Sequence, residues 1–99
     1  MKKTNFYSMV RENTGAAVAL QQKGYTDGTY YYYKKDSLWH VIHPANGLSV
    51  CSAYTKKEAA TRAHEPRMAE RIAAAIERQQ DAAERFAAAV EKAEKEAVA

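Results

Sequence analysis

The C-terminal third of the chain repeats an acidic-basic pair every seven residues. The pairs are Glu70-Arg71, Glu77-Arg78, Glu84-Arg85 and Glu91-Lys92. Seven residues make two turns of an α-helix, so this spacing predicts a helix with the four pairs on one side. The a and d positions of the same heptad frame form an apolar seam and hold Ala69, Ile72, Ile76, Ala83, Phe86, Val90, Ala93 and Ala97. Such a seam must be covered by the rest of the chain or by a partner.

The helical region is expected in two parts. Thr55 and Glu58 form a capping box, in which each side chain satisfies a free amide of the first turn. Pro66 cannot continue the helical hydrogen-bond ladder, so a break is expected between His64 and Pro66. A second helix is then predicted from Pro66 to about Ala97, roughly 48 Å long at 1.5 Å per residue.

The seam of the second helix is predicted to make its main contacts. The residues expected there are Ile72, Ile76, Gln79, Ala83, Phe86 and Val90, with Gln79 interrupting the apolar d positions. A five-stranded sheet is about 24 Å wide and covers about half of a 48 Å helix. The half from Ala83 onward is therefore expected to need a partner, and we favour homodimerisation or docking of another protein over fraying.

Two segments of the N-terminal half match at an offset of thirty-two residues. Residues 7–11 correspond to residues 39–43, and residues 14–19 correspond to residues 46–51. In each copy, two stretches of alternating apolar residues are separated by a glycine turn. Thr-Gly or Asn-Gly between alternating apolar residues predicts a β-hairpin. The match favours a strand at Ala16 to Leu20, although alanine propensity alone would favour a helix there.

Four consecutive tyrosines, Tyr30 to Tyr33, lie between the hairpins and have high strand propensity. The expected fold class is therefore α+β: a five-stranded antiparallel β-meander followed by a short capped helix and a long heptad-patterned helix. The residues assigned to an aliphatic core face are Phe6, Val10, Val18, Leu20, Leu38, Ile42, Leu48 and Val50. Those assigned to the opposite face are Tyr7, Met9, Arg11, Ala17, Ala19, Trp39, Val41, His43 and Cys51.

The 99 residues are enough for one structural unit, which we divide into a β-meander with the first helix (1–65) and the amphipathic helix (66–99). No apolar run approaches the roughly 20 residues of a membrane-spanning helix. The basic start of the chain leads into no signal-peptide core. One cysteine, Cys51, suits a reducing compartment, so a cytoplasmic location without membrane association is expected.

Three kinds of chemistry are not expected. His40 and His43 are expected to point to opposite faces of a strand, so without a bulge they cannot share a metal ion. No cofactor is predicted. Cys51 has no evident group to lower its pKa and is interpreted as a small buried residue. The acidic residues of the β half, Glu12, Asp27 and Asp36, all fall in turns. The sequence thus indicates no enzyme.

The aromatic face is the strongest candidate for a binding site. It is predicted to contain Tyr7, Arg11, Tyr30, Tyr32, Lys34, Lys35, Trp39 and His43. Residues 1–65 hold nine Lys or Arg against five Asp or Glu, a net charge of +4, and residues 66–99 have a net charge of −1. Aromatic and basic side chains together are typical of single-stranded nucleic-acid platforms and equally of protein-binding patches. Tyrosines also fill sheets simply because they pack well there.

The small β-meander, with its Lys56-Lys57-Glu58-Ala59 helix start and no catalytic residues, resembles in general style the small accessory proteins of phages and mobile elements. Some of these, the anti-CRISPR proteins, inhibit host nucleases by binding them, and the resemblance implies no site residue. The leading expectation is a non-catalytic protein-binding protein, which could inhibit a nucleoprotein nuclease complex by steric occlusion. The alternatives are a small nucleic-acid-binding module and a structural dimerisation protein.

Overall fold

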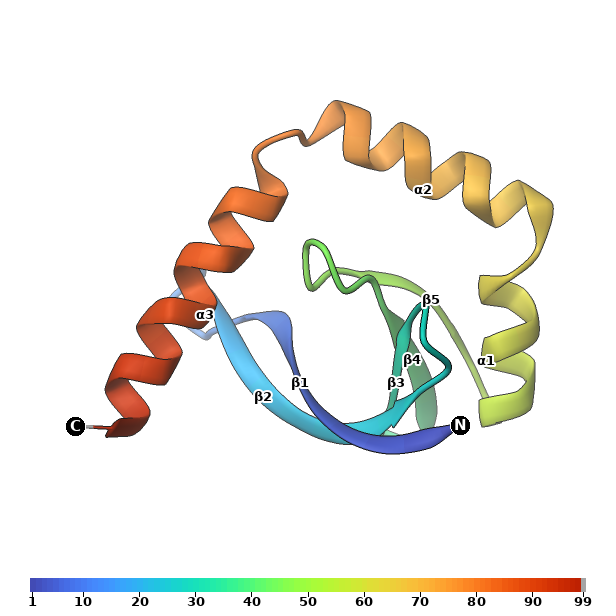
Figure 1. Cartoon of the computed structure of the whole chain (residues 1–99), viewed down its shortest axis with the longest axis horizontal. Coiled ribbons are helices and arrows are strands. Elements are labelled where there is room, and N and C mark those ends of the chain that lie inside the picture. The colour runs from blue at the N-terminus through green and yellow to red at the C-terminus, as the bar shows by residue number, and fades with distance from the viewer. Residues whose placement is uncertain (99) are drawn as a thin grey trace.

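The computed structural model describes residues 1–98 and has an α+β fold with one antiparallel sheet and three helices (Figure 1). The strands are β1 (Lys2–Arg11), β2 (Ala17–Thr26), β3 (Tyr31–Lys35), β4 (Leu38–Ile42) and β5 (Ser49–Ala53). The helices are α1 (Lys56–Ala63), α2 (Pro66–Arg78) and α3 (Ala82–Val98). The predicted α+β class and the five-stranded antiparallel sheet are confirmed. None of the helices within residues 1–98 has both the length and the apolar character needed to cross a membrane.

The five strands follow one another in the order β1-β2-β3-β4-β5, each antiparallel to its neighbour. Both predicted glycine turns are present, with φ of 87° at Gly15 and 67° at Gly47, values that a side chain would disfavour. In the first turn the amide of Gly15 donates to the carbonyl of Glu12, and in the second the amide of Gly47 donates to the carbonyl of His43. The second loop is thus one residue longer than the first.

The first hairpin has the predicted face assignment. Val10 lies opposite Val18 and Met9 opposite Ala19, so Phe6, Val10, Val18 and Leu20 share a face. The strand predicted through the alanine-rich stretch is present, since β2 begins at Ala17. Cross-strand pairing with β1 outweighs the helical propensity of alanine there.

The second hairpin departs from the predicted register. A bulge between Val41 and Ile42 shifts the pairing, so that Val41 lies opposite Cys51 but Ile42 lies opposite Ser49. Val50 consequently packs with the cluster around Val41 and not with Ile42, as had been predicted. A bulge adds one residue to one strand, and every side chain beyond it moves to the other face.

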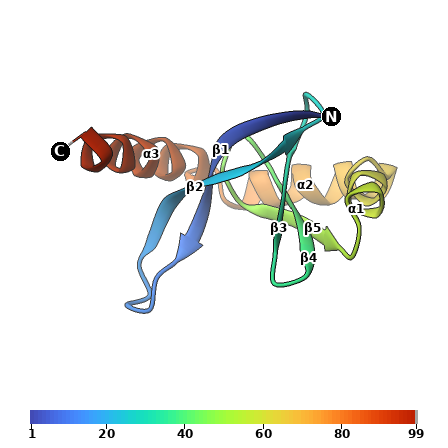
Figure 2. The same ribbon diagram turned by 90° about the horizontal axis from the view of Figure 1, so that it is seen from below.

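The sheet curls strongly, and the long β1–β2 hairpin crosses the remaining strands and projects beyond them (Figure 2). β2 pairs with β3 only through Tyr25 with Tyr32 and Thr26 with Tyr31. Gly24 precedes this pairing, and a Cβ atom there would overlap the carbonyl oxygen of Tyr32. At the other end of β1, the amide of Met9 donates to the carbonyl of Gly47 over 2.8 Å. The curl therefore brings β1 against the loop that precedes β5.

The core has two parts, one on each face of the sheet. On one face Phe6 stacks on Tyr31 at 4.6 Å between ring centroids and meets the edge of Tyr33 at 5.8 Å, beside the buried Ile42. On the other face the small residues of α1 pack on the sheet. The members of this second cluster are Tyr30, Tyr32, Val41, Ala53, Ala59 and Ala63. The helices thus cover the face that was assigned to binding, and the predicted aliphatic face is closed mainly by aromatic rings of the sheet itself.

The positions of the α1 start and of the break after it are as predicted, and the Thr55 hydrogen bond of the expected capping box is present. The hydroxyl of Thr55 accepts the amide of Glu58 over 3.1 Å. α1 ends at its cap His64, and α2 starts at Pro66 after the extended residue Glu65. Proline suits this first helical position because the N–H that it lacks would have no hydrogen-bond partner within the helix there.

The prediction of one long second helix is wrong. α2 ends at Arg78, Gln79 has φ −124° and ψ 60°, and a new helix starts at Ala82. Asp81 stands before the new helix and its carbonyl accepts the amide of Arg85. A straight helix of roughly 48 Å would exceed the longest dimension of the whole molecule, 40 Å. The turn lets α3 fold back instead.

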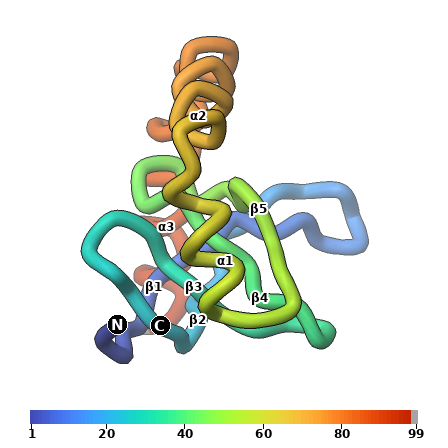
Figure 3. Tube along the Cα trace, turned by 90° about the vertical axis from the view of Figure 1, so that its right-hand side faces the viewer, coloured from blue at the N-terminus to red at the C-terminus, as the bar shows by residue number. Residues whose placement is uncertain are grey.

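α3 packs against β2 of the same chain, so the half from Ala83 onward already has a neighbour, contrary to the prediction that it needs a partner. Phe86 adds a contact with the β4–β5 loop: its ring lies directly on Gly47, where a side chain would overlap it. Ala82 is 5% exposed and Ala19 of β2 is 9% exposed. By contrast α2 stands clear of the sheet (Figure 3).

Candidate interaction surfaces

The predicted aromatic binding face lies under α1. Tyr32 has no exposed surface and Tyr30 is 9% exposed, both in the cluster that contacts α1. The expectation that these two rings form an accessible platform is wrong, because Ala59 and Ala63 carry only methyl groups and let the helix lie close on the tyrosines. Trp39 is half-buried at the edge of α1, with its ring 6.0 Å from that of Tyr25.

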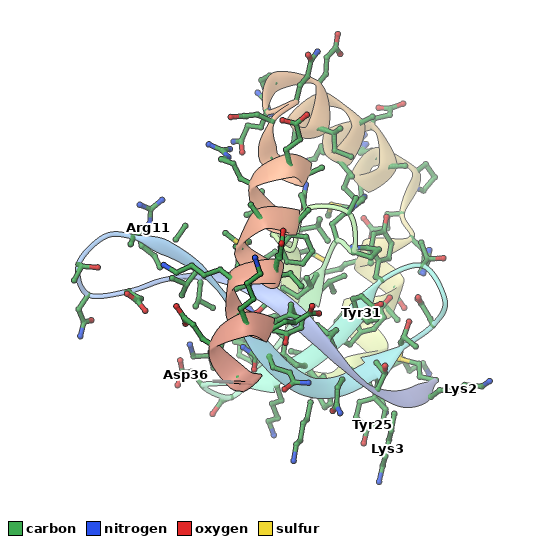
Figure 4. All side chains as sticks on the ribbon, turned by 60° about the vertical axis from the view of Figure 1, so that its left-hand side comes forward. Lys2, Lys3, Arg11, Tyr25, Tyr31 and Asp36 are labelled. Carbon is green, nitrogen blue, oxygen red and sulfur yellow. The ribbon has the colours of Figure 1, made fainter. Side chains whose placement is uncertain are left out.

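The other predicted face residues do not gather in one place. Arg11 is at the far end of the β1–β2 hairpin, where its Nη1 donates to the carbonyl of Gly15 over 3.0 Å (Figure 4). Tyr7 is half-buried on β1. Lys34 and Lys35 are both exposed, and as neighbours on a strand they point to opposite faces. The eight predicted residues thus do not make one surface.

His43 is half-buried at the end of β4 and belongs to the loop it precedes. Its Nδ1 accepts the amide of Ala45 over 3.1 Å, and burial lowers its pKa. The neutral ring therefore serves to close the β4–β5 loop.

A cluster around Asp27 was missed from the sequence, where this residue was assigned only to a turn. Oδ1 of Asp27 accepts the amides of Thr29 and Tyr30, each over 2.9 Å. Oδ2 accepts the hydroxyl of Tyr32 over 2.6 Å and lies 2.7 Å from Nε2 of His64. An aspartate two residues before a turn amide is a recognisable Asx turn, but nothing local indicates the tyrosine or the histidine.

The electrostatics of this cluster follow from its hydrogen bonds. Partial burial alone would raise the pKa of Asp27, but the amide of Tyr30, the Tyr32 hydroxyl and the His64 ring together lower it well below its ordinary value of 3.8. Burial and the hydrogen bond to Asp27 raise the pKa of Tyr32. The charged carboxylate and the protonated phenol tie the β2–β3 loop to β3, and the contact with His64 ties the same loop to the end of α1.

Two candidates for chemistry have unfavourable surroundings. Burial raises the pKa of Cys51, which keeps its thiol protonated and weakly nucleophilic. In the part of the chain that the structure describes, no group of three His, Cys, Asp or Glu side chains is placed to hold a metal ion.

The predicted helix seam is divided by the turn at Gln79 and does not form one stripe. Ile72 of α2 packs against the α1 cluster, whereas Ile76 is 40% exposed. On α3, Phe86 and Val90 are half-buried and Ala83 is exposed. Gln79 caps α2 with its amide on the carbonyl of Ala75.

A cleft of about 370 Å³ separates α2 from the β4–β5 loop. The larger apolar residues of its lining are Leu48, Val50, Met68, Ile72 and Ile76. The charged residues at its wall are Arg71 and Arg78, and none of the lining residues is acidic. No residue within Pro66–Arg78 is buried, and Leu48 is 37% exposed across the cleft. α2 therefore presents apolar side chains to a space that the chain itself leaves open.

Comparisons with protein-family models, curated proteins and solved structures returned no match.

Proposed function

We propose that the protein is a non-catalytic binding protein that captures a partner protein in the cleft between α2 and the β4–β5 loop. The observation that carries this proposal is the state of α2, an amphipathic helix of which no residue within Pro66–Arg78 is buried. Its apolar side faces Leu48 and Val50 across the cleft. Exposure of an apolar surface of this kind to water is unfavourable, and the free energy falls when a partner covers it.

The charges around the cleft define the partner's chemistry. Arg71 and Arg78 flank the apolar lining, and no carboxylate lies among the lining residues. Arginine pairs well with carboxylates in a partly desolvated setting. The expected occupant is thus a segment of another protein that carries apolar side chains with Asp or Glu beside them, in the manner of a helix in a groove.

The partner class that we propose is a nucleoprotein nuclease complex, which the protein would inhibit by steric occlusion. Support for this class comes from the resemblance in style to the anti-CRISPR proteins, while support for binding as such comes from the exposed side of α2. Capture of a partner requires no catalytic group in this chain.

The test compares variants on and off the cleft wall. Arg78→Glu and Ile76→Glu alter residues that line the cleft. Arg67→Glu is the control: it makes the same charge change as Arg78→Glu, also on α2, at a residue that does not line the cleft. A partner captured by the wild type should be retained by Arg67→Glu and lost by the two cleft variants, with all proteins folded by circular dichroism. Equal retention by all three variants would reject the cleft. Light scattering tests the alternative that a second copy of the chain occupies the cleft. That alternative is supported if the isolated wild type is a dimer and Ile76→Glu is a monomer.

A further inference from the structure

A second surface lies on the side of the sheet next to α1 and consists of four lysines around two aromatic rings. We call it the lysine stripe: Lys3, Lys23, Lys34 and Lys56 with Tyr25 and Trp39. The β register places Lys3 opposite Tyr25, and Lys34 opposite Trp39. Tyr25 in turn pairs with Tyr32, which is two residues from Lys34 on β3 and so on the same face. The stripe therefore crosses four strands on one face of the sheet.

Lys56 connects the two halves of the stripe. Its Nζ lies 3.9 Å from the centroid of the Tyr25 ring and 5.7 Å from that of Trp39. These cation–π contacts hold the ammonium group beside both rings, with its hydrogen-bond donors free to meet an anion. The flexible lysine side chain is thus partly preorganised at the centre of the stripe.

The β1–β2 end of the stripe is a shallow groove. A space of about 430 Å³ is lined by Lys3, Thr4, Asn5, Lys23, Gly24 and Tyr25. Lys3 and Tyr25 extend from the same side of the molecule (Figure 4). Within β1 to β4, all of which the structure describes, no strand position on this face is acidic. The positive field of the stripe is therefore not neutralised by its own strands.

We infer that the lysine stripe binds single-stranded nucleic acid, with the lysines on successive phosphates and the rings of Tyr25 and Trp39 against bases. Charge complementarity favours a ligand with several negative charges, and the two half-buried rings favour one that exposes flat apolar faces. A single strand offers base faces, whereas a duplex encloses them in its own stack. This site is separate from the α2 cleft and does not depend on the function proposed for it.

Trp39 provides a direct measurement because it is the only tryptophan in the sequence. Titration of the intact protein with a twenty-residue oligothymidylate should quench Trp39 fluorescence. For four phosphate contacts, the logarithm of the binding constant should fall with the logarithm of salt concentration with a slope of about −3. Tyr25→Ala should weaken binding by about tenfold through lost stacking, and the fluorescence reporter remains in this variant.

Matched lysine variants decide whether the stripe is the site. Lys23→Ala and Lys34→Ala should each reduce the salt slope by about 0.7. Lys92→Ala on α3 removes the same charge from an exposed position outside the stripe and should leave the slope unchanged. The inference is overturned if the oligonucleotide does not quench Trp39, if Lys92→Ala weakens binding as much as Lys34→Ala, or if a duplex of equal length binds more tightly than the single strand.

Discussion

Nε2 of His64 lies 2.7 Å from Oδ2 of Asp27, thirty-seven residues away, and this contact joins the end of α1 to the loop between β2 and β3. The same oxygen accepts the hydroxyl of the fully buried Tyr32. The side chain of Asp27 is 19% exposed and that of His64 is 49% exposed. One carboxylate thus fixes a turn, a core tyrosine and the helix that covers it.

Replacement of Asp27 is expected to be among the most destabilising changes outside the apolar core. Asp27→Ala removes the acceptor of all four hydrogen bonds and should lower the free energy of unfolding by about 2–4 kcal/mol. Hydrogen bonds to a charged group are worth about 1.5–3 kcal/mol each, and their contributions do not add fully. Asp27→Asn keeps an acceptor for the turn amides and should cost less. Urea denaturation measures both values. If Asp27→Ala costs less than a typical surface substitution, the proposed structural role of this cluster is contradicted.

The same carboxylate should make stability depend on pH in the acid range. Its pKa in the folded protein lies below its ordinary value of 3.8, so the unfolded chain binds the proton more readily. The stabilisation is therefore fully present above about pH 4 to 5 and is lost as the pH falls through the lower folded pKa. Between pH 6 and pH 2, the melting temperature should fall less for Asp27→Asn than for the wild type. Equal losses would assign the acid sensitivity to other carboxylates.

Gly24 is expected to tolerate no side chain. The Cβ of Gly24→Ala would overlap the carbonyl oxygen of Tyr32 and lie 3.1 Å from the ring of Phe6. Backbone atoms cannot rotate away, so β2 must shift and unfolding should become easier by at least about 2 kcal/mol. Lys23→Ala, at an exposed neighbouring position, should change stability by less than about 0.5 kcal/mol. Similar melting temperatures for these two variants would show that the close approach is not structural.

The turn between β3 and β4 offers a stabilising substitution. Asp36 and Ser37 have φ of 54° and 67°, and Lys35 pairs with Leu38, so the two residues form a type I′ hairpin loop without glycine. Ser37→Gly should remove the cost of a left-handed serine and raise stability by about 0.5 kcal/mol after the entropy of glycine is allowed for. Ser37→Ala should give no such gain. Calorimetry resolves the expected rise of a few degrees, and a lower melting temperature for Ser37→Gly would contradict it.

Phe86 is expected to hold α3 on the sheet. Phe86→Ala leaves the surface over Gly47 empty and should lower stability by about 2–3 kcal/mol, less than for a fully buried phenylalanine because this ring is half-buried. Amide hydrogen exchange should accelerate along α3 more than along β3 and β4. Arg85→Ala, which removes only a surface pair with Asp81, is the control and should leave exchange nearly unchanged. Uniform acceleration throughout the chain would mean that α3 does not open as a separate unit.

Local signals predicted the elements better than their contacts. The capping residue Thr55 and the breaker Pro66 determine the limits of α1 through bonds within one turn, and both predictions are confirmed. The break at Gln79 carries no glycine or proline and was not predicted. The helix direction changes there, and α3 folds back so that the ring of Phe86 lies on Gly47, a contact between residues thirty-nine positions apart.

The sequence by itself determined the five strands, their antiparallel order and the first register, because alternation and turn chemistry act over a few residues. Only the tertiary structure decided which face the helices cover, since the aromatic face and the aliphatic face both supply enough apolar surface to be buried. The small Ala59 and Ala63 allow α1 to lie on Tyr30 and Tyr32, and Asp27 fixes the helix there through His64. Tyr30 and Tyr32, which were expected to face a partner, therefore form part of the core, and the exposed surfaces lie along α2 and the lysine stripe.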